Sequence, residues 1–217
     1  MYDTLLFDLD GTLTNPEEGI TNCVKYALES FDIIETNREK LIAFIGPPLK
    51  TSFMGIYNMT EAQADSAVAK YRERFAKVGM YENKVFDGVP RMLKALKEKG
   101  FKTAIATSKP IEFAREILRY FDLLKYFDLT VGPELNKGLG EKSEIVAEAI
   151  SRLGVSGKSK MIMIGDREMD VLGAKENGIA SVGVTYGFAV DGELENAGAD
   201  YIVNSIKELE TLLLSFM

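Results

Sequence analysis

The sequence predicts an α/β protein: a parallel, doubly wound core of three layers with a small inserted α-helical domain. From residue 81 onward, short apolar runs alternate with amphipathic helical patterns, an order that produces a parallel sheet with right-handed crossovers. One further apolar run, residues 5–7, stands far ahead of the others. The segment between them has helical periodicity and no convincing strand pattern. We therefore assign residues 1–14 and 80–217 to the core and residues 15–79 to the inserted domain.

The inserted domain carries several helix signals. Asn15-Pro16-Glu17-Glu18 combines a cap residue, an early proline and acidic residues, which together start a helix. Apolar residues follow at helical spacing from Ile20 to Phe31. Thr36-x-x-Glu39 and Thr60-x-x-Gln63 have the form of capping boxes, and Gly46-Pro47-Pro48 interrupts the region between them.

The core elements follow from periodicity and from end signals. Glycines at 100, 154 and 178 each stop a helical pattern, and Ser205-x-x-Glu208 caps the last one. Helices are expected at 90–99, 110–120, 142–153, 168–177 and after Ser205, and strands at 103–106, 128–131, 161–164, 181–184 and 201–203.

Composition excludes several classes of function. Of the 217 residues 46% are hydrophobic, enough for a substantial core, and the net charge of −7 argues against nucleic acid as a partner. An anionic substrate must therefore be held by a few lysines or by a metal ion. Cys23, the only cysteine, lies on an apolar helical face and is expected in the core, so no intrachain disulfide forms. The absence of histidine excludes Ser-His-Asp and Cys-His catalysis and histidine-bound zinc.

The location of the protein is inferred from its apolar runs. The first strand pattern begins almost at residue 1, so we expect no signal peptide, and no apolar run approaches the length of a membrane span. We expect a cytoplasmic protein that acts on a small molecule and does not bind a membrane, with a monomer as the default oligomeric state.

The most informative motif is Asp8-Leu9-Asp10-Gly11-Thr12, directly after the first strand. Side chains alternate along a strand, so the two carboxylates converge only if the chain bends, and Gly11 permits a bend. A plain Asp-Gly turn is the structural alternative. The complete string after a buried strand favours a functional site instead, because open α/β sheets place their chemistry at the carboxyl ends of strands.

Three later strands end in polar signals of the same kind. Thr107-Ser108 precedes a helix and suits a phosphate, although a hydroxyl there also serves as a helix cap. Lys142 opens a helix against the preference of the helix dipole, and a solvated lysine is its ordinary interpretation. Asp166 and Asp170 stand four residues apart at a helix start and suit Mg²⁺, unless Asp166 only caps that helix. In a parallel sheet these strand ends meet at one edge, which predicts a single site.

With these motifs the chain resembles the haloacid dehalogenase-like hydrolase superfamily, and within it the phosphoglycolate phosphatase-like group. The likeness covers essentially the whole chain, and the helical insert looks like the small cap of that family. Its motifs occur in order: Phe7-Asp8-Leu9-Asp10-Gly11-Thr12-Leu13-Thr14, Ala106-Thr107-Ser108-Lys109-Pro110, Lys142-Ser143-Glu144-Ile145-Val146, and the string from Ile164 through Gly165-Asp166 and Asp170 to Gly178.

The resemblance implies a phosphatase that transfers the phosphoryl group to Asp8, with Asp10 as general acid and then base. Thr107 and the Ser108 amide would bind the phosphate, and Lys142 would anchor both the phosphate and Asp8.

The resemblance also implies a cofactor. Mg²⁺ would bind Asp8, the backbone carbonyl of Asp10 and Asp166, with Asp170 supporting it directly or through water. One departure from the family lies at Asn136-Lys137-Gly138-Leu139, where relatives often carry an Asp-Gly-x-Arg-like loop.

The expected activity is Mg²⁺-dependent hydrolysis of a small phosphate monoester, with phosphoglycolate as the family's example. A nucleoside monophosphate is the alternative substrate, and a sugar phosphomutase is a more remote alternative. A signalling receiver domain does not fit the motif order. Dehalogenase chemistry does not use the second aspartate.

Substrate recognition is expected from the insert, because the core motifs handle only the phosphoryl group. Lys50 follows the Gly-Pro-Pro turn and is our candidate contact for an anionic group of the substrate. A helix–helix turn with a solvated lysine is the alternative.

Overall fold

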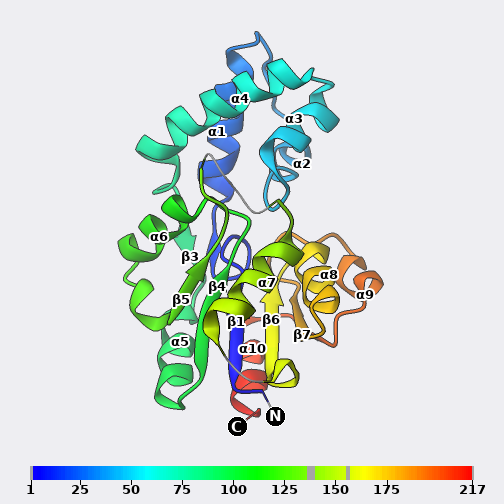
Figure 1. Ribbon diagram of the computed structural model, residues 1–217. Coiled ribbons are helices and arrows are strands. Elements are labelled where there is room, and N and C mark those ends of the chain that lie inside the picture. The colour runs from blue at the N-terminus through cyan, green and yellow to red at the C-terminus, as the bar shows by residue number, and fades with distance from the viewer. Residues whose placement is uncertain (1, 136–139, 155–156, 217) are drawn as a thin grey trace. The chain divides into compact units, whose positions relative to one another are not determined.

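The computed structural model describes residues 2–135, 140–154 and 157–216 and divides the chain into two compact units (Figure 1). The first unit comprises Met1–Thr14 and Val85–Met217, and the second comprises Asn15–Lys84. The second crossing between units thus falls at residues 84–85, five residues later than the boundary at 79–80 that the sequence patterns predict. The assignment of these parts as a hydrolase core and a cap stays a prediction.

The first unit contains a six-stranded sheet in the order β5-β4-β1-β6-β7-β8. Each adjacent pair of these strands is parallel, which confirms the predicted fold class. Phe7 on β1 pairs with Ile105 on β4 and with Ile164 on β6, so these three strands end side by side. The strands are β1 (Thr4–Phe7), β4 (Lys102–Ala106), β5 (Leu129–Val131), β6 (Met161–Gly165), β7 (Ala180–Val184) and β8 (Tyr201–Val203).

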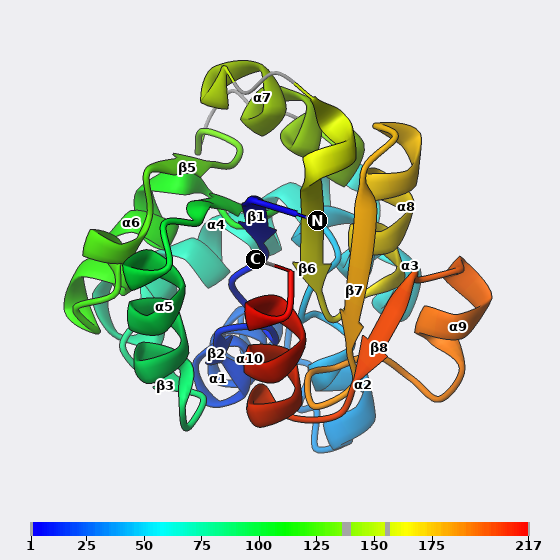
Figure 2. The same ribbon diagram turned by 90° about the horizontal axis from the view of Figure 1, so that it is seen from below.

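Helices cover both faces of this sheet (Figure 2). On one face, α7 (Lys142–Leu153) and α8 (Glu168–Glu176) pack on the central strands, and on the other lie α5 (Val89–Glu98) and α10 (Ile206–Leu214). Apolar side chains fill the α7 side, including Leu6 of β1, Met163 of β6 and Val146 of α7, all fully buried. The unit also holds α6 (Ile111–Tyr120), α9 (Glu193–Ala197) and the 3₁₀ turns η2 (Leu124–Tyr126) and η3 (Lys158–Lys160).

The second unit is helical, as the periodicity of the insert predicts. It contains α1 (Glu17–Glu29), α2 (Arg38–Ile42), α3 (Leu49–Tyr57), α4 (Glu61–Arg74) and a π-helical turn, η1 (Phe75–Gly79). The two crossing segments, β2 (Thr14–Asn15) and β3 (Lys84–Val85), pair as a two-stranded sheet that the sequence patterns do not reveal. Cys23 is buried, as expected.

Helix starts in the second unit test the two predicted capping boxes. The box formed by Thr60 and Gln63 is confirmed. The box at Thr36 is wrong: Asn37 caps α2 by accepting hydrogen bonds from the amides of Glu39 and Lys40. The Glu35 carboxylate accepts from the amides of Thr36 and Asn37, which fixes these residues ahead of the helix.

Among the residues that the structure describes, none belongs to a helix long and apolar enough to cross a membrane.

Candidate active site

The first motif forms a tight turn after β1. The Leu9 carbonyl accepts hydrogen bonds from the amides of Thr12, Leu13 and Thr14, which folds the chain back on itself. Gly11 has φ +85°, and a Cβ there would lie 2.1 Å from the Asp166 carboxylate. A larger residue at this position would therefore be strained and would also clash with the site. The bend that the sequence predicts is present, and it depends on glycine.

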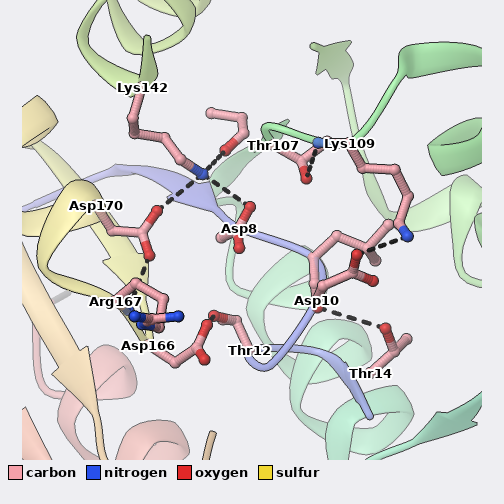
Figure 3. A network of polar contacts seen from close by, with 12 residues as sticks. Asp8, Asp10, Thr12, Thr14, Thr107, Lys109, Lys142, Asp166, Arg167 and Asp170 are labelled. Carbon is pink, nitrogen blue, oxygen red and sulfur yellow. Dashed lines mark hydrogen bonds and ion pairs between the residues drawn. The ribbon is translucent and has the colours of Figure 1, made fainter. Parts of the chain in front are cut away.

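Lys142 joins two carboxylates of the site (Figure 3). Its Nζ lies 2.8 Å from Asp8 Oδ1, 2.8 Å from Asp170 Oδ1 and 3.1 Å from the Ala106 carbonyl oxygen. Burial alone would lower the pKa of the Lys142 ammonium, but the charges of Asp170 and Asp8 outweigh it and raise this pKa. Lys142 is therefore a buried lysine paired with two carboxylates, not the solvated lysine of the alternative interpretation.

Asp166 is completely buried beneath the first turn. Its Oδ2 accepts a hydrogen bond from the Phe188 amide at 2.9 Å, and its Oδ1 accepts from the Thr12 hydroxyl at 3.2 Å. The residue that caps α8 is Arg167, whose amide donates to Asp170 Oδ2 at 3.1 Å. Asp166 is thus not the helix cap, and that alternative is wrong.

The ionised forms of Asp166 and Asp170 are disfavoured by burial and by neighbouring negative charge. Burial, followed by the charges of Asp170 and Asp8, raises the pKa of Asp166 well above its ordinary value. Burial also raises the pKa of Asp170, although Lys142 opposes this shift. Asp8, Asp166 and Asp170 each have one carboxylate oxygen within 4.8 Å of the corresponding oxygens of the other two. Three hard oxygen donors with an excess of negative charge fit Mg²⁺.

Asp10 takes no part in that cluster through its side chain. Its Oδ2 lies 2.6 Å from Lys109 Nζ, and both side chains are largely buried. Within the described part of the chain, its other oxygen, Oδ1, is buried without a hydrogen-bond partner. Burial raises the pKa of Asp10, and the charge of Lys109 opposes that shift. The Asp10 carboxyl group is thus held beside a cation in a buried setting.

The loop after β4 is shaped by its own hydrogen bonds. Thr107 is buried, and its Oγ1 accepts from the Lys109 amide at 3.2 Å. Helix α6 begins after Pro110 with no side-chain cap, so the interpretation of Thr107 or Ser108 as the helix cap is wrong. The Thr107 hydroxyl still has its own hydrogen to donate, and Ser108 follows it in the same loop.

Two parts of the site were missed by sequence reasoning. Lys109 stands in the motif string, and its position two residues beyond Thr107 was the signal that could have identified it. Glu193 had no such signal. It accepts hydrogen bonds from Arg167 Nε at 2.8 Å, the Glu168 amide at 2.8 Å and the Val190 amide at 3.0 Å. It thereby connects the start of α8 to the loop that supports Asp166.

The remaining candidates lie elsewhere. Lys50 belongs to the second unit, where its Nζ lies 2.9 Å from Asp65 and 3.3 Å from Glu61, two acidic side chains of α4. The lysine is exposed but paired within its own unit, and a substrate contact at Lys50 stays a prediction. The departure at residues 136–139 lies outside the described residues.

Comparisons with known proteins agree with this arrangement. The family model for haloacid dehalogenase-like hydrolases matches residues 5–184. A 5'-nucleotidase from Pseudomonas aeruginosa is 47% identical over 193 residues, which cover 89% of this chain and 87% of that protein. The crystal structure of a predicted phosphatase from Clostridium acetobutylicum superposes with a TM-score of 0.94 at 49% identity, covering 99% of both chains.

A predicted phosphoglycolate phosphatase from Haemophilus somnus has the same fold, with a TM-score of 0.84 at 20% identity over 97% of both chains. The family match spans most of the chain and contains all four motifs. The chain therefore belongs to the haloacid dehalogenase-like hydrolase family and is a phosphoric monoester hydrolase.

Proposed function

We propose that this enzyme hydrolyses a small phosphate monoester in two steps, with Asp8 as the nucleophile that carries the phosphoryl group between them. The observation that supports this best is the placement of Asp8. Its carboxylate stands at the end of β1, and one of its oxygens lies 2.8 Å from the buried ammonium group of Lys142. A carboxylate held in this way can attack phosphorus, and covalent capture divides a very slow reaction into two faster ones.

In the first step an Asp8 oxygen bonds to phosphorus while the bond from phosphorus to the ester oxygen breaks. Asp10 gives its proton to the departing oxygen. In the second step a water oxygen bonds to phosphorus, the bond from phosphorus to Asp8 breaks, and the water proton passes to Asp10. Phosphate leaves, and Asp10 is protonated again for the next cycle.

The other side chains bind and orient the phosphoryl group. The Thr107 hydroxyl and the Ser108 amide would donate to its oxygens, and Lys142 would offset its charge. Mg²⁺ would be held by Asp8 and Asp166, the Asp10 carbonyl and, directly or through water, Asp170. When bound, the ion reduces the repulsion between the carboxylate and the anionic phosphoryl group.

For the substrate we place nucleoside 5'-monophosphates ahead of phosphoglycolate. The relative with 47% identity is named a 5'-nucleotidase, whereas the phosphoglycolate phosphatase match, at 20% identity, supports only the fold. Phosphoglycolate remains the second candidate. A phosphomutase is distinguished by its product, because it returns the phosphoryl group to a sugar instead of releasing it to water.

The test is a panel of phosphate esters with Mg²⁺, scored by released inorganic phosphate. We expect turnover of nucleoside 5'-monophosphates above that of phosphoglycolate, and no turnover in EDTA. The matched variant is Asp8→Asn, which keeps the shape of the side chain but not its nucleophilic charge and should abolish turnover. Activity within about tenfold of the parent in this variant would refute the covalent mechanism.

A further inference from the structure

Lys109 stands on a firmly held backbone next to the expected phosphate loop. Its amide donates to Thr107 Oγ1 at 3.2 Å, and Pro110 follows it. A Cβ added to Gly132 would lie 2.8 Å from the carbonyl oxygens of both Thr107 and Lys109. The backbone of this loop therefore packs directly on the backbone at Gly132, just after β5. The Ile111 amide also donates to the Pro133 carbonyl at 2.8 Å. The Lys109 side chain therefore extends from a fixed base.

The far end of that side chain reaches the second carboxylate of the first motif. Lys109 Nζ lies 2.6 Å from Asp10 Oδ2, and the two side chains are 7% and 12% exposed. Figure 3 shows Lys109 reaching Asp10 from the side opposite Lys142, which binds Asp8. The two aspartates, two residues apart, thus have separate lysines. Asp10 Oδ1 has no hydrogen-bond partner among the described residues, so the ion pair at Oδ2 is a contact that orients this carboxyl group.

We propose that Lys109 is a positioning residue that holds the Asp10 carboxyl group in the rotamer from which it transfers protons. The proposal rests on the function proposed above, because it needs Asp10 to act as acid and base. Lys109 itself would neither donate the proton nor bind the phosphoryl group. Its contribution would lie in geometry, and a misplaced proton donor is a poor catalyst even when it is present.

This role makes a prediction that phosphate binding by Lys109 would not make. Esters with a good leaving group, such as p-nitrophenyl phosphate, need little help from an acid when the ester bond breaks. Alkyl esters, including nucleoside 5'-monophosphates, have a strongly basic alkoxide as leaving group. Their hydrolysis therefore depends on a proton from the general acid. Loss of Lys109 should therefore lower kcat/KM for alkyl esters much more than for the aryl ester.

The experiment measures kcat/KM for both esters in the parent, Lys109→Met, Asp10→Asn and the double variant. We expect Lys109→Met to lower kcat/KM for the alkyl ester by about 10- to 100-fold and for p-nitrophenyl phosphate by less than about threefold. In the Asp10→Asn background, Lys109→Met should change neither value more than about twofold, because its effect passes through Asp10. Lys109→Arg, which keeps the charge, should recover part of the loss.

Several results would overturn the proposal. An equal fall for both esters, or a full further loss in the Asp10→Asn background, would show that Lys109 contacts the substrate itself. Unchanged kinetics in Lys109→Met would remove it from catalysis altogether. If Asp10→Asn leaves the ratio between the two esters unchanged, the acid role proposed for Asp10 fails, whatever Lys109 does.

Two controls separate these effects from misfolding. Lys97→Met removes an exposed lysine that pairs with Asp128 in the same unit, and it should leave all kinetic values unchanged. Urea unfolding of each variant checks that the compared enzymes are folded. If Lys109→Met does not fold, Lys109→Gln replaces it under the same criteria, since it removes the charge but keeps a hydrogen-bond donor.

Discussion

Replacing Asp166 with asparagine should stabilise the metal-free enzyme while removing its response to Mg²⁺. The carboxylate is fully buried, and oxygens of Asp8 and Asp170 can lie within 4.8 Å of it. Asparagine has the same shape and can keep both hydrogen bonds. Its oxygen can accept from the Phe188 amide, and its amide can donate to the Thr12 hydroxyl, which would then act as acceptor. The substitution therefore removes charge with little change in packing.

The magnitude follows from Coulomb's law. Two unit charges about 5 Å apart interact with about 3 kcal/mol at an effective dielectric constant of about 20. Lys142 offsets part of this repulsion, and a neutral amide makes weaker hydrogen bonds than a carboxylate. We therefore expect a net gain of about 1–2 kcal/mol in the free energy of unfolding at pH 8. For a chain of this size, that gain raises the melting temperature by about 2–8 °C.

The gain should depend on pH in a definite direction. The pKa of Asp166 is raised in the folded state, so at low pH both the folded and the unfolded chain hold the proton and the charge has no effect. As pH rises past the unfolded value, about 3.9, the unfolded chain ionises first, and the folded parent loses stability until its own pKa is reached. The advantage of Asp166→Asn should therefore be small near pH 4.5 and grow toward pH 8.

Thermal unfolding in EDTA and in Mg²⁺ tests both halves of the argument. The parent should gain about 2.7 kcal/mol when Mg²⁺ is present at about 100 times its dissociation constant, and Asp166→Asn should gain far less. Asp200→Asn is the matched control, because Asp200 accepts hydrogen bonds from Ser181 outside the cluster. It should leave the gain from Mg²⁺ unchanged. An Asp166→Asn variant that is less stable than the parent in EDTA at pH 8 would refute the repulsion argument.

Three further substitutions test other parts of the molecule. Lys142→Met removes the partner of two buried carboxylates, so it should cost about 3–5 kcal/mol in urea unfolding and abolish turnover; a stable, active variant would contradict this. Glu193→Gln should weaken Mg²⁺ binding, measured by calorimetry, by up to about tenfold, because the loop beside Asp166 loses its link to α8; unchanged affinity would exclude that link. Lys50→Ala should raise KM several-fold for the native anionic substrate but not for p-nitrophenyl phosphate if it contacts substrate. No effect on either would mean that its pairing with Asp65 and Glu61 is its whole role.

The strand ends were predictable because their signals are local and strong. A buried apolar run followed by a polar residue marks the carboxyl end of a parallel strand, and parallel register brings such ends together. Phe7 lies between Ile105 and Ile164 in the sheet, so the residues after each of them converge. Asp8, Thr107 and Asp166 follow these positions at short distances in the sequence.

The features that the sequence did not reveal are side-chain contacts. They depend on which partner a side chain can contact in the folded chain, and on which of two residues makes a given hydrogen bond. Asn37, and not Thr36, caps α2 because the Glu35 carboxylate binds the amides of Thr36 and Asn37 ahead of the helix. Hydrophobic periodicity carries no signal for such a contact. Glu193 acts from the five-residue helix α9, too short to leave a periodic pattern. Lys109 is part of a recognised motif, but the sequence does not show that it pairs with Asp10. That pairing depends on how the turn at Gly11 directs the Asp10 carboxylate.

The two lysines of the site do not neutralise all of its carboxylates. Four carboxylates, those of Asp8, Asp10, Asp166 and Asp170, share the ammonium groups of Lys109 and Lys142. Arg167, the adjacent cation, is already paired with Glu193. With all groups ionised, the side chains carry an excess of two negative charges in a buried setting, which is costly unless it is offset. The raised pKa of Asp166 reflects that cost. One divalent cation at Asp8, Asp166 and Asp170 would cancel the excess, so that an anionic phosphoryl group could approach the nucleophile without net repulsion.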